Sequence, residues 1–353
     1  MDTSAEAVLY EEGDHQAVDC FLCSHRCHIA AGRTGFCRVR RNIDGRLISL
    51  VYGRLAARHL DPIEKKPFYH FLPGTTAYSI ATPGCNFRCP FCQNWQISQI
   101  DAVSVLQGLP CVPPQDVVDE AAARGAAGIS YTYTEPTIVM EYALDCVRLA
   151  RQRGLKNSFV TNGYQSPEAV EAMTGLIDAA NVDLKAFSDD FYRTQCSARL
   201  QPVLDAIAAM HRAGIHVEVT TLLIPGANDS PGELRELADF LAGLSPDIPW
   251  HISRFHPDYR ATDLPPTPLE TMRTAEQAGR EAGLNYVYLG NVPTPEGQTT
   301  RCPGCGGVLI RRKGFSRPEI RLTEPRCPQC GRDVPIVLES PATNRHSSSS
   351  GSR

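Results

Sequence analysis

The sequence predicts an α/β fold, a partial (β/α)6-like barrel with a Cys-rich module on each side of it. Between Ala77 and about Leu289, short apolar runs rich in β-branched residues alternate with longer segments of helical periodicity. Eleven of the 14 cysteines fall in three groups, one inside this alternation and one on either side. Strand and helix repeated this often predict parallel strands joined by crossover helices.

The alternation defines the expected elements. We expect strands at residues 77–82, 129–133, 157–161, 181–185, 215–223, 249–254 and 285–289. We expect helices at about residues 115–124, 137–153, 167–179, 199–213, 231–243 and 267–282. Asp116, Ser166 and Ser230 are the expected helix caps. Six or seven such units predict a partial barrel or an open parallel sheet.

The chain divides into four parts. We expect a Cys-rich N-terminal module at residues 1–73, the barrel at 74–295 and a second Cys-rich module at 296–340. The Ser-rich residues 341–353 are expected to be a disordered tail. A length of 353 residues suits one large domain with small appendages.

Composition narrows the class of function. The formal net charge of −4 gives no general attraction to nucleic acid or to a membrane surface. No apolar run approaches the roughly 20 residues that span a bilayer, and the N-terminus does not read as a secretory signal. We therefore expect a cytoplasmic protein whose clustered cysteines bind metal rather than form disulfides. Cys111, Cys146 and Cys196 stand alone and are interpreted as small buried residues.

The central cysteines have the spacing CxxxCxxC, at Cys85, Cys89 and Cys92. Three thiolates on one loop hold three irons of a cubane cluster and leave the fourth iron open, which is the site that chelation by S-adenosylmethionine (SAM) requires. A zinc knuckle, or a closed cluster with Cys111 as fourth ligand, has a compatible spacing. The loop follows the first strand of a parallel α/β domain, where active sites lie, and this position favours the open cluster.

The surrounding sequence resembles a known family. CxxxCxxC with Phe91 before its last cysteine is similar to the radical SAM signature, and DPIEKKPFYHFLPG followed by GCNFRCPFCQNWQISQ resembles the radical SAM member of the AmmeMemoRadiSam system. That group is related to the pyruvate formate-lyase activating enzymes. The resemblance extends to CFLCSHRCHIAAGRTGFC and GNVPTPEG, and so to nearly the whole chain. It implies a radical SAM barrel with a 4Fe–4S cluster and SAM.

Polar residues at the expected strand ends are candidates for holding SAM. Glu135 matches the carboxylate of a Gly-Gly-Glu-like motif in the activating enzymes, although Tyr133 and Thr134 replace the glycines. The alternative role for Glu135 is a charge at a helix N-terminus. Asn162, in a Thr-Asn-Gly run, is interpreted either as a SAM ligand or as an ordinary turn residue.

Three further candidates lie on later strands. Asp183 and Lys185 share one face of a strand and resemble the Asp-x-Lys of the activating enzymes, with a purely structural ion pair as the alternative. His251 resembles a histidine near the adenosyl group, and a core histidine is the alternative. Arg254 follows on the same strand and is a weaker candidate for meeting a carboxylate.

The C-terminal group reads CPGC, then 21 residues, then CPQC, at Cys302, Cys305, Cys327 and Cys330. Two such knuckles describe a zinc ribbon, in which the metal supplies folding energy that a small core lacks. Nucleic-acid binding through the basic residues between the knuckles is the alternative to a stabilising cap.

The N-terminal group, Cys20, Cys23, Cys27 and Cys37, is less regular. We interpret it as a zinc site first and a second iron–sulfur cluster next, with free thiols as the alternative. His25 and His28 lie among these cysteines. Glu64, Lys65, Lys66, Tyr69 and His70 precede the first strand, where contact with substrate and simple packing are equally good interpretations.

Together the residues and the resemblance predict a radical SAM oxidoreductase. It would cleave SAM reductively to a 5′-deoxyadenosyl radical that abstracts hydrogen from a substrate, with glycyl-radical formation on a partner protein as one candidate outcome. The resemblance implies an electron donor such as ferredoxin or flavodoxin, and the AmmeMemoRadiSam companions as possible partners. The alternatives are a multi-cluster electron-transfer protein and a zinc-ribbon nucleic-acid-binding protein, the latter disfavoured by the acidic net charge.

Overall fold

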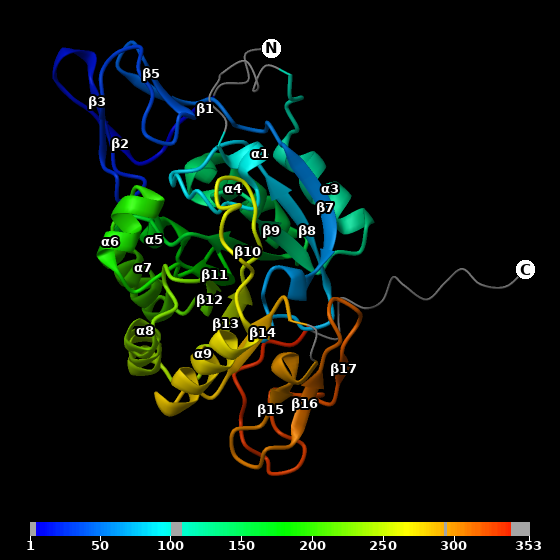
Figure 1. Ribbon diagram of the computed structural model, residues 1–353. Coiled ribbons are helices and arrows are strands. Elements are labelled where there is room, and N and C mark those ends of the chain that lie inside the picture. The colour runs from blue at the N-terminus through cyan, green and yellow to red at the C-terminus, as the bar shows by residue number, and fades with distance from the viewer. Residues whose placement is uncertain (1–4, 100–107, 293–294, 340–353) are drawn as a thin grey trace, which may run out of the picture.

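The computed structural model describes residues 5–99, 108–292 and 295–339, so the predicted tail at 341–353 lies outside the described residues. Its centre is an eight-stranded sheet in the order β14-β13-β12-β11-β10-β9-β8-β7 (Figure 1). The strands are β7 (Ala57–Pro62), β8 (Thr76–Ala81), β9 (Gly128–Tyr131), β10 (Lys156–Thr161), β11 (Ala179–Asp183), β12 (His216–Leu223), β13 (Trp250–Arg254) and β14 (Val287–Gly290). β7 pairs with β8 antiparallel, and every other neighbouring pair is parallel.

The predicted alternation is confirmed, with a helix in every crossover between the parallel strands β8 to β14. The longer helices are α3 (Pro114–Ala123), α4 (Met140–Gln152), α5 (Pro167–Met173), α7 (Leu200–Arg212), α8 (Pro231–Leu244) and α9 (Leu269–Glu281). The short ones are α1 (Trp95–Ser98), α6 (Asp189–Phe191), η1 (Asp14–Gln16), η2 (Ile63–Lys65), η3 (Pro136–Val139), η4 (Tyr192–Cys196) and η5 (Pro295–Gln298).

The ends of the helices are set by capping side chains and by glycine conformation. The Ser166 and Ser230 hydroxyls accept hydrogen bonds from the first turns of α5 and α8, as the sequence predicts. The prediction for Asp116 is wrong: Pro113 occupies the cap of α3 without a side-chain bond, and Asp116 lies in the first turn. Helix α5 ends at Met173 and is therefore shorter than the predicted helix 167–179, because Gly175 takes a left-handed conformation just after it.

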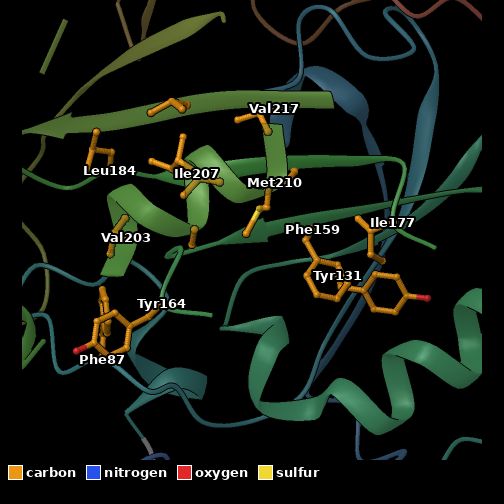
Figure 2. Close-up of a cluster of buried hydrophobic side chains, with 14 of the residues drawn as sticks. Phe87, Tyr131, Phe159, Tyr164, Ile177, Leu184, Val203, Ile207, Met210 and Val217 are labelled. Atoms are coloured by element: carbon orange, nitrogen blue, oxygen red, sulfur yellow. The ribbon is translucent and has the colours of Figure 1, made fainter. Parts of the chain in front are cut away.

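The main core lies between the sheet and its helices. Figure 2 shows Val203, Ile207 and Met210 of α7 within this cluster of buried apolar side chains. At one edge of the cluster, the rings of Phe87 and Tyr164 lie 5.2 Å apart (Figure 2). Phe87 belongs to the CxxxCxxC segment, so this packing anchors the cysteine loop to the barrel.

The N-terminal module contains two small antiparallel sheets, with orders β1-β6-β5 and β2-β3-β4. Their strands are β1 (Ala5–Glu6), β2 (Tyr10–Glu12), β3 (Val18–Cys20), β4 (Cys27–Ile29), β5 (Arg40–Ile43) and β6 (Arg46–Ser49). Their buried residues, Val18 and Ile29 among them, belong to the same core as the barrel. β7 also falls within residues 1–73, yet it pairs with β8 in the large sheet, and the boundary at residue 73 stays a prediction.

The C-terminal module is a small sheet of order β15-β16-β17, formed by β15 (Thr300–Arg301), β16 (Val308–Arg311) and β17 (Glu319–Ile320). Figure 1 shows it at the opposite end of the molecule from the N-terminal strands. It has its own small core, which includes Leu309 and Ile336. Within the described parts of the chain, no helix is both long and apolar enough to cross a bilayer.

Candidate active site at the carboxyl ends of the strands

A cavity of about 500 Å³ opens where the parallel strands end. Its wall contains side chains from the loops after β8, β9, β10 and β11 and from β12 and β13 themselves. Eight sequence-predicted site residues line it: Cys85, Cys89, Cys92, Glu135, Asn162, Asp183, Lys185 and His251. Arg254 does not join them, because its Nε donates to the Thr267 carbonyl oxygen at 2.7 Å. The fold therefore gathers residues spread over about half of the chain around one volume.

The cysteine loop presents three thiols to this cavity. Cys89 is buried and Cys85 and Cys92 are half-buried, and burial raises the pKa of the Cys85 and Cys92 thiols. The Phe87 N–H donates to the Cys85 Sγ at 3.3 Å. These three sulfurs are not all within 4.8 Å of one another, the spacing at which several residues meet at a single ion. Their separation suits a larger inorganic group.

Cys196 lies against this loop. The sequence analysis did not predict this contact. Its Sγ is 3.7 Å from the Cys89 Sγ, and this contact is the largest cause of the raised pKa of Cys89, ahead of burial. The Cys196 carbonyl oxygen accepts the Arg88 N–H at 3.0 Å. The interpretation of Cys196 as a buried residue is right, but it does not stand alone. It comes from a π-helical turn more than 100 residues away, and no local sequence signal links the two cysteines.

Glu135 ties two strand ends together. Its carboxylate accepts hydrogen bonds from the Thr137 N–H at 3.0 Å, the Thr161 hydroxyl at 2.7 Å and the Asn162 N–H at 2.8 Å. Burial raises the pKa of Glu135, and these bonds act in the opposite direction. Glu135 is also the cap of η3, so its predicted helix-terminal role is present in the structure.

Tyr133 stands where the resembling enzymes carry a glycine, and its φ of 65° is in the left-handed region that favours glycine. Its side chain is held in place: its hydroxyl donates to Asp61, and the Lys66 Nζ lies 3.9 Å from the ring centroid. Lys66 also pairs with Asp61 at 2.7 Å. Burial lowers the pKa of Lys66 to about 8, which Asp61 only partly offsets.

The Thr-Asn-Gly turn after β10 is packed tightly. The Asn162 Nδ2 donates to the Asn86 Oδ1 at 2.7 Å, which links the turn to the cysteine loop. Gly163 has a φ of 73°, and a Cβ there would lie 2.7 Å from Val182 and 2.9 Å from Val203. Only glycine fits this position without displacing the core.

Asp183 and Lys185 form an ion pair beside the cysteines, with 3.1 Å between the Lys185 Nζ and the Asp183 Oδ2. Burial alone would lower the pKa of Lys185, but Asp183 and the nearby thiols of Cys89 and Cys196 outweigh it and raise this pKa. Lys185 therefore stays a cation next to two thiols and a carboxylate, where an anionic group is favoured.

His251 is held by a buried carboxylate that sequence reasoning also missed. Its Nε2 lies 2.6 Å from the Glu218 Oε2, and the other Glu218 oxygen accepts the His70 N–H at 2.8 Å. Burial alone would raise the pKa of Glu218, but the hydrogen bonds from His216 and His251 outweigh it and lower this pKa. The sequence did contain a signal for Glu218, since it is a charged residue in the middle of the apolar strand HVEVTTLL.

The segment before β8 completes the wall. Glu64, Lys65, Lys66 and Tyr69 line the cavity, whereas His70 is buried behind it and bonds to the Tyr288 hydroxyl at 2.7 Å. The ion pairs of Lys65 and Lys66 with Asp61 agree with the packing interpretation of this segment, and contact with substrate stays a prediction.

Comparison with known sequences identifies the fold family. The sequence model described as "Radical SAM superfamily" matches residues 79–241, which run from β8 into α8 and include the cysteine loop. The chain contains a radical SAM domain at these residues. This family implies an iron–sulfur cluster and SAM as cofactors.

Among relatives of this radical SAM protein, the uncharacterized protein MJ0808 of Methanocaldococcus jannaschii is 44% identical over 338 residues, covering 94% of this chain and 99% of the relative. The pyruvate formate-lyase-activating enzyme of Clostridium pasteurianum is 23% identical, covering 46% of this chain and 67% of the enzyme. A solved radical SAM methyltransferase from Sphaerobacter thermophilus is similar at a TM-score of 0.49 and 20% identity, covering 63% of this chain and 67% of that protein.

The radical SAM protein also has a four-cysteine group at its C-terminal end. The ligand atoms of Cys302, Cys305, Cys327 and Cys330 all lie within 4.8 Å of one another. The Sγ–Sγ distances are 3.6 Å for Cys302 and Cys330 and 3.7 Å for Cys305 and Cys327. Four thiols this close can hold one metal ion in a tetrahedron.

Proposed function

We propose that this protein is a radical SAM enzyme of the activating-enzyme type, in which Cys85, Cys89 and Cys92 bind a 4Fe–4S cluster and the adjoining cavity binds SAM. The single observation that carries the proposal is that the three thiols of one loop share a cavity with the Asp183–Lys185 pair, at the carboxyl ends of parallel strands.

The residues fit these cofactors in size and chemistry. The cavity volume of about 500 Å³ is within the range of small-molecule sites. Three thiols too widely spaced to meet at one ion suit a cluster that needs three protein ligands. Lys185, Asp183 and Glu135 supply both signs of charge for a zwitterionic amino-acid end such as that of SAM.

When bound and reduced, the cluster supplies the electron that cleaves SAM into methionine and a 5′-deoxyadenosyl radical. The chain's own residues bind SAM and orient it. Lys185 offers a cation to the carboxylate of SAM, and Glu135 and Asn162 stand at neighbouring strand ends for its polar groups. His251, oriented by Glu218, presents a ring to the same cavity.

The names of the relatives support the proposed substrate class. Several are named as activating enzymes, for pyruvate formate-lyase, for isethionate sulfite-lyase and for benzylsuccinate synthase. We propose hydrogen abstraction from a partner protein as the second half of the reaction, with a ferredoxin- or flavodoxin-like electron donor. The AmmeMemoRadiSam companions are the first partners to test, because the resemblance at residues 61–74 and 84–99 points to that group. An oxygen-sensitive cluster and 14 free thiols favour the reducing cytoplasm.

The C-terminal group is proposed to bind zinc and to brace the cavity wall. Arg312, on the chain just after β16, is buried against the segment before β8: its Nη2 donates to the Tyr69 carbonyl oxygen at 2.6 Å, and its Nε lies 3.7 Å from the Glu64 carboxylate. Both contacted residues line the cavity. The module then acts through packing, which is the stabilising-cap interpretation.

The decisive assay is 5′-deoxyadenosine formation by anaerobically reconstituted, dithionite-reduced full-length protein. We expect the wild type to form it, Cys89→Ala to form none, and Lys185→Met to show a SAM affinity at least tenfold weaker, which is about 1.4 kcal/mol. Cys146→Ala removes a buried thiol away from the cavity and is the matched control, expected to match the wild type. A wild type that holds an intact cluster yet cleaves no SAM would refute the proposal in favour of an electron carrier.

A further inference from the structure

One lysine of the large cavity lies at its inner end, away from the cysteine loop. Lys66 lines the cavity, and its Nζ lies 2.7 Å from the Asp61 carboxylate. Asp61 pairs with Ala77 near the start of β8, whereas the cysteine loop follows the end of β8 at Ala81. A strand rises about 3.3 Å per residue, so these two backbone levels lie about 13 Å apart along β8. The cavity therefore reaches toward the amino ends of the strands, beyond the level at which the cluster is proposed to bind.

Four residues at this inner end form a group that we call the floor cluster: Asp61, Lys65, Lys66 and Tyr133. The Lys65 Nζ lies 2.9 Å from one Asp61 oxygen, and the Lys66 Nζ lies 2.7 Å from the other. The neighbouring Glu64 does not balance this second cation, because its own carboxylate lies 3.7 Å from the Arg312 Nε. One carboxylate thus faces two ammonium groups, and the floor cluster has one positive charge in excess.

Lys66 is the member of the floor cluster with donors to spare. Its side chain is 2% exposed, against 47% for Lys65, so water screens its charge least. Among the described residues, Asp61 is its one polar partner, and the Tyr133 ring covers a second side. An ammonium group has three N–H donors, which leaves at least one for an acceptor in the cavity. Because burial lowers the pKa of Lys66 to about 8, a second negative partner would stabilise its charged form.

Tyr133 is strained where it covers this lysine. Its φ of 65° is a left-handed conformation, which costs a non-glycine residue about 1–3 kcal/mol. The Tyr133 hydroxyl donates to Asp61, and its ring centroid lies 3.9 Å from the Lys66 Nζ, so the floor cluster holds the strained residue in place. Backbone strain of this kind gathers at ligand sites. Tyr133 and Glu135 both line the cavity, so one short run of chain joins the floor cluster to the proposed SAM end.

We propose that the floor cluster binds a carboxylate group of the substrate, with Lys66 as its direct partner. A carboxylate has a single negative charge, which matches the one excess positive charge of the floor cluster, and it accepts well from an ammonium group. It belongs either to a small organic acid or to an acidic side chain of a partner protein, and both present the same group. The carboxylate site stands on the floor cluster alone, whereas its assignment to the substrate rests on the function proposed above.

Labelling of the lysines tests the site in the reconstituted wild type with SAM present, so misfolding of a variant cannot decide the result. Formaldehyde with cyanoborohydride methylates amines that are accessible and unprotonated, and mass spectrometry follows each lysine separately. At pH 7 butyrate is expected to slow the methylation of Lys66 about tenfold, the effect of raising its pKa by about one unit. Uncharged butyramide and the dianion sulfate are expected to have little effect.

Lys156 is the internal control, since it is half exposed and pairs with Asp178 away from the cavity. Its methylation is expected to proceed at one rate under all conditions. A Lys66 that does not react at all would overturn the proposal, because its amine would then not face the cavity. Protection of Lys66 by butyramide or sulfate as strong as that by butyrate would overturn it as well.

A second probe identifies the source of the carboxylate. The α-amide of N-acetylglutamic acid presents a side-chain carboxylate on a blocked amino acid, as a partner protein would. Protection of Lys66 by this probe and by butyrate supports the site with an acidic side chain as its ligand. Protection by butyrate alone supports the site with a small organic acid as its ligand.

Direct binding gives an independent readout. In saturation-transfer NMR with SAM present, the wild type is expected to transfer magnetisation to butyrate, Lys66→Met to lose this signal, and the control Lys156→Met to keep it. Butyrate binding that persists in Lys66→Met would overturn the proposal. A wild type that binds butyrate at Lys66 yet forms no 5′-deoxyadenosine would refute the proposed function and leave the carboxylate site standing.

Discussion

The two outer cysteine groups offer the same four thiols in different settings. The C-terminal sulfurs close to within 4.8 Å, two of the cysteines are exposed, and the surrounding core is separate from the barrel. The N-terminal thiols line a cavity together with Leu22, Ile29 and Ile138 of the barrel core, and none of the four cysteines is exposed. The comparison teaches that ligand count does not define a metal site. The exposure of the cysteines and the core that each group joins distinguish the two groups.

The largest effect is expected from removing the C-terminal thiols. In Cys327→Ala/Cys330→Ala the module would lose the proposed zinc ion, and such an ion contributes on the order of 10 kcal/mol to the folding of small zinc modules. Hydrogen–deuterium exchange is expected to rise throughout residues 296–339 and to stay slow in β3 and β4. An unchanged exchange pattern in β15–β17 would remove the structural distinction between the two groups. Cys146→Ala serves as the unaffected thiol variant.

The second prediction concerns the N-terminal side. Arg40 and Glu141 form a buried ion pair, with side chains 1% and 5% exposed. Arg40→Met leaves a buried carboxylate unpaired, so we expect a loss of about 3–5 kcal/mol in the free energy of unfolding. The control Arg46→Met breaks an exposed pair, 64% and 44% exposed, and is expected to cost about 0–1 kcal/mol. Urea denaturation measures both, and equal costs would show that the N-terminal site is not embedded in the core.

The third prediction tests the brace. Arg312→Met removes the donor to the Tyr69 carbonyl oxygen and the cation near Glu64. Leaving such buried groups unpaired is expected to cost about 2–3 kcal/mol and to speed exchange at the amides around Tyr69. Arg311→Met changes the exposed neighbouring residue and is expected to be nearly neutral. A neutral Arg312→Met would mean that the C-terminal module does not support the cavity wall.

The smallest effect is expected from Glu218, which holds the segment around Tyr69 through backbone hydrogen bonds. Its charge is expected to make the stability of the fold depend on pH. Glu218 accepts the Tyr69 and His70 N–H groups, and its pKa is lowered in the folded state. The unfolded chain takes up this proton at the ordinary glutamate pKa of about 4.3, before the folded chain does. The stability that ionised Glu218 contributes is therefore present above that pH and lost as the pH falls below it. Glu218→Gln is expected to flatten the acid limb of the unfolding curve, whereas the exposed Glu236→Gln is expected to leave it unchanged.

Much of the barrel can be predicted from the sequence, because each strand is a short apolar run and each helix shows helical periodicity in its apolar residues. The observed strands β8–β14 begin and end within about two residues of the predicted ranges. The eight candidate site residues meet in one cavity since parallel strands bring their carboxyl ends to one edge. Their individual cofactor contacts stay predictions, as does zinc at the C-terminal group.

What sequence reasoning missed depends on contacts between distant segments. Cys196 meets Cys89 through a π-helical turn, and β7 joins the large sheet by antiparallel pairing with β8. Neither contact leaves a local pattern, because both are set by how distant segments pack. Tyr133 is a different case. The sequence showed that Tyr133 replaces a glycine of the resembling enzymes, but it did not show that Asp61 and Lys66 hold the Tyr133 side chain in place.

The contact between Arg312 and Tyr69, which lie far apart in the sequence, has a consequence for the synthesis of the chain. The segment that it holds, around Tyr69, is made early, yet its contact arrives only after about 240 further residues have left the ribosome. The nascent barrel therefore carries an unfinished wall until the last module emerges.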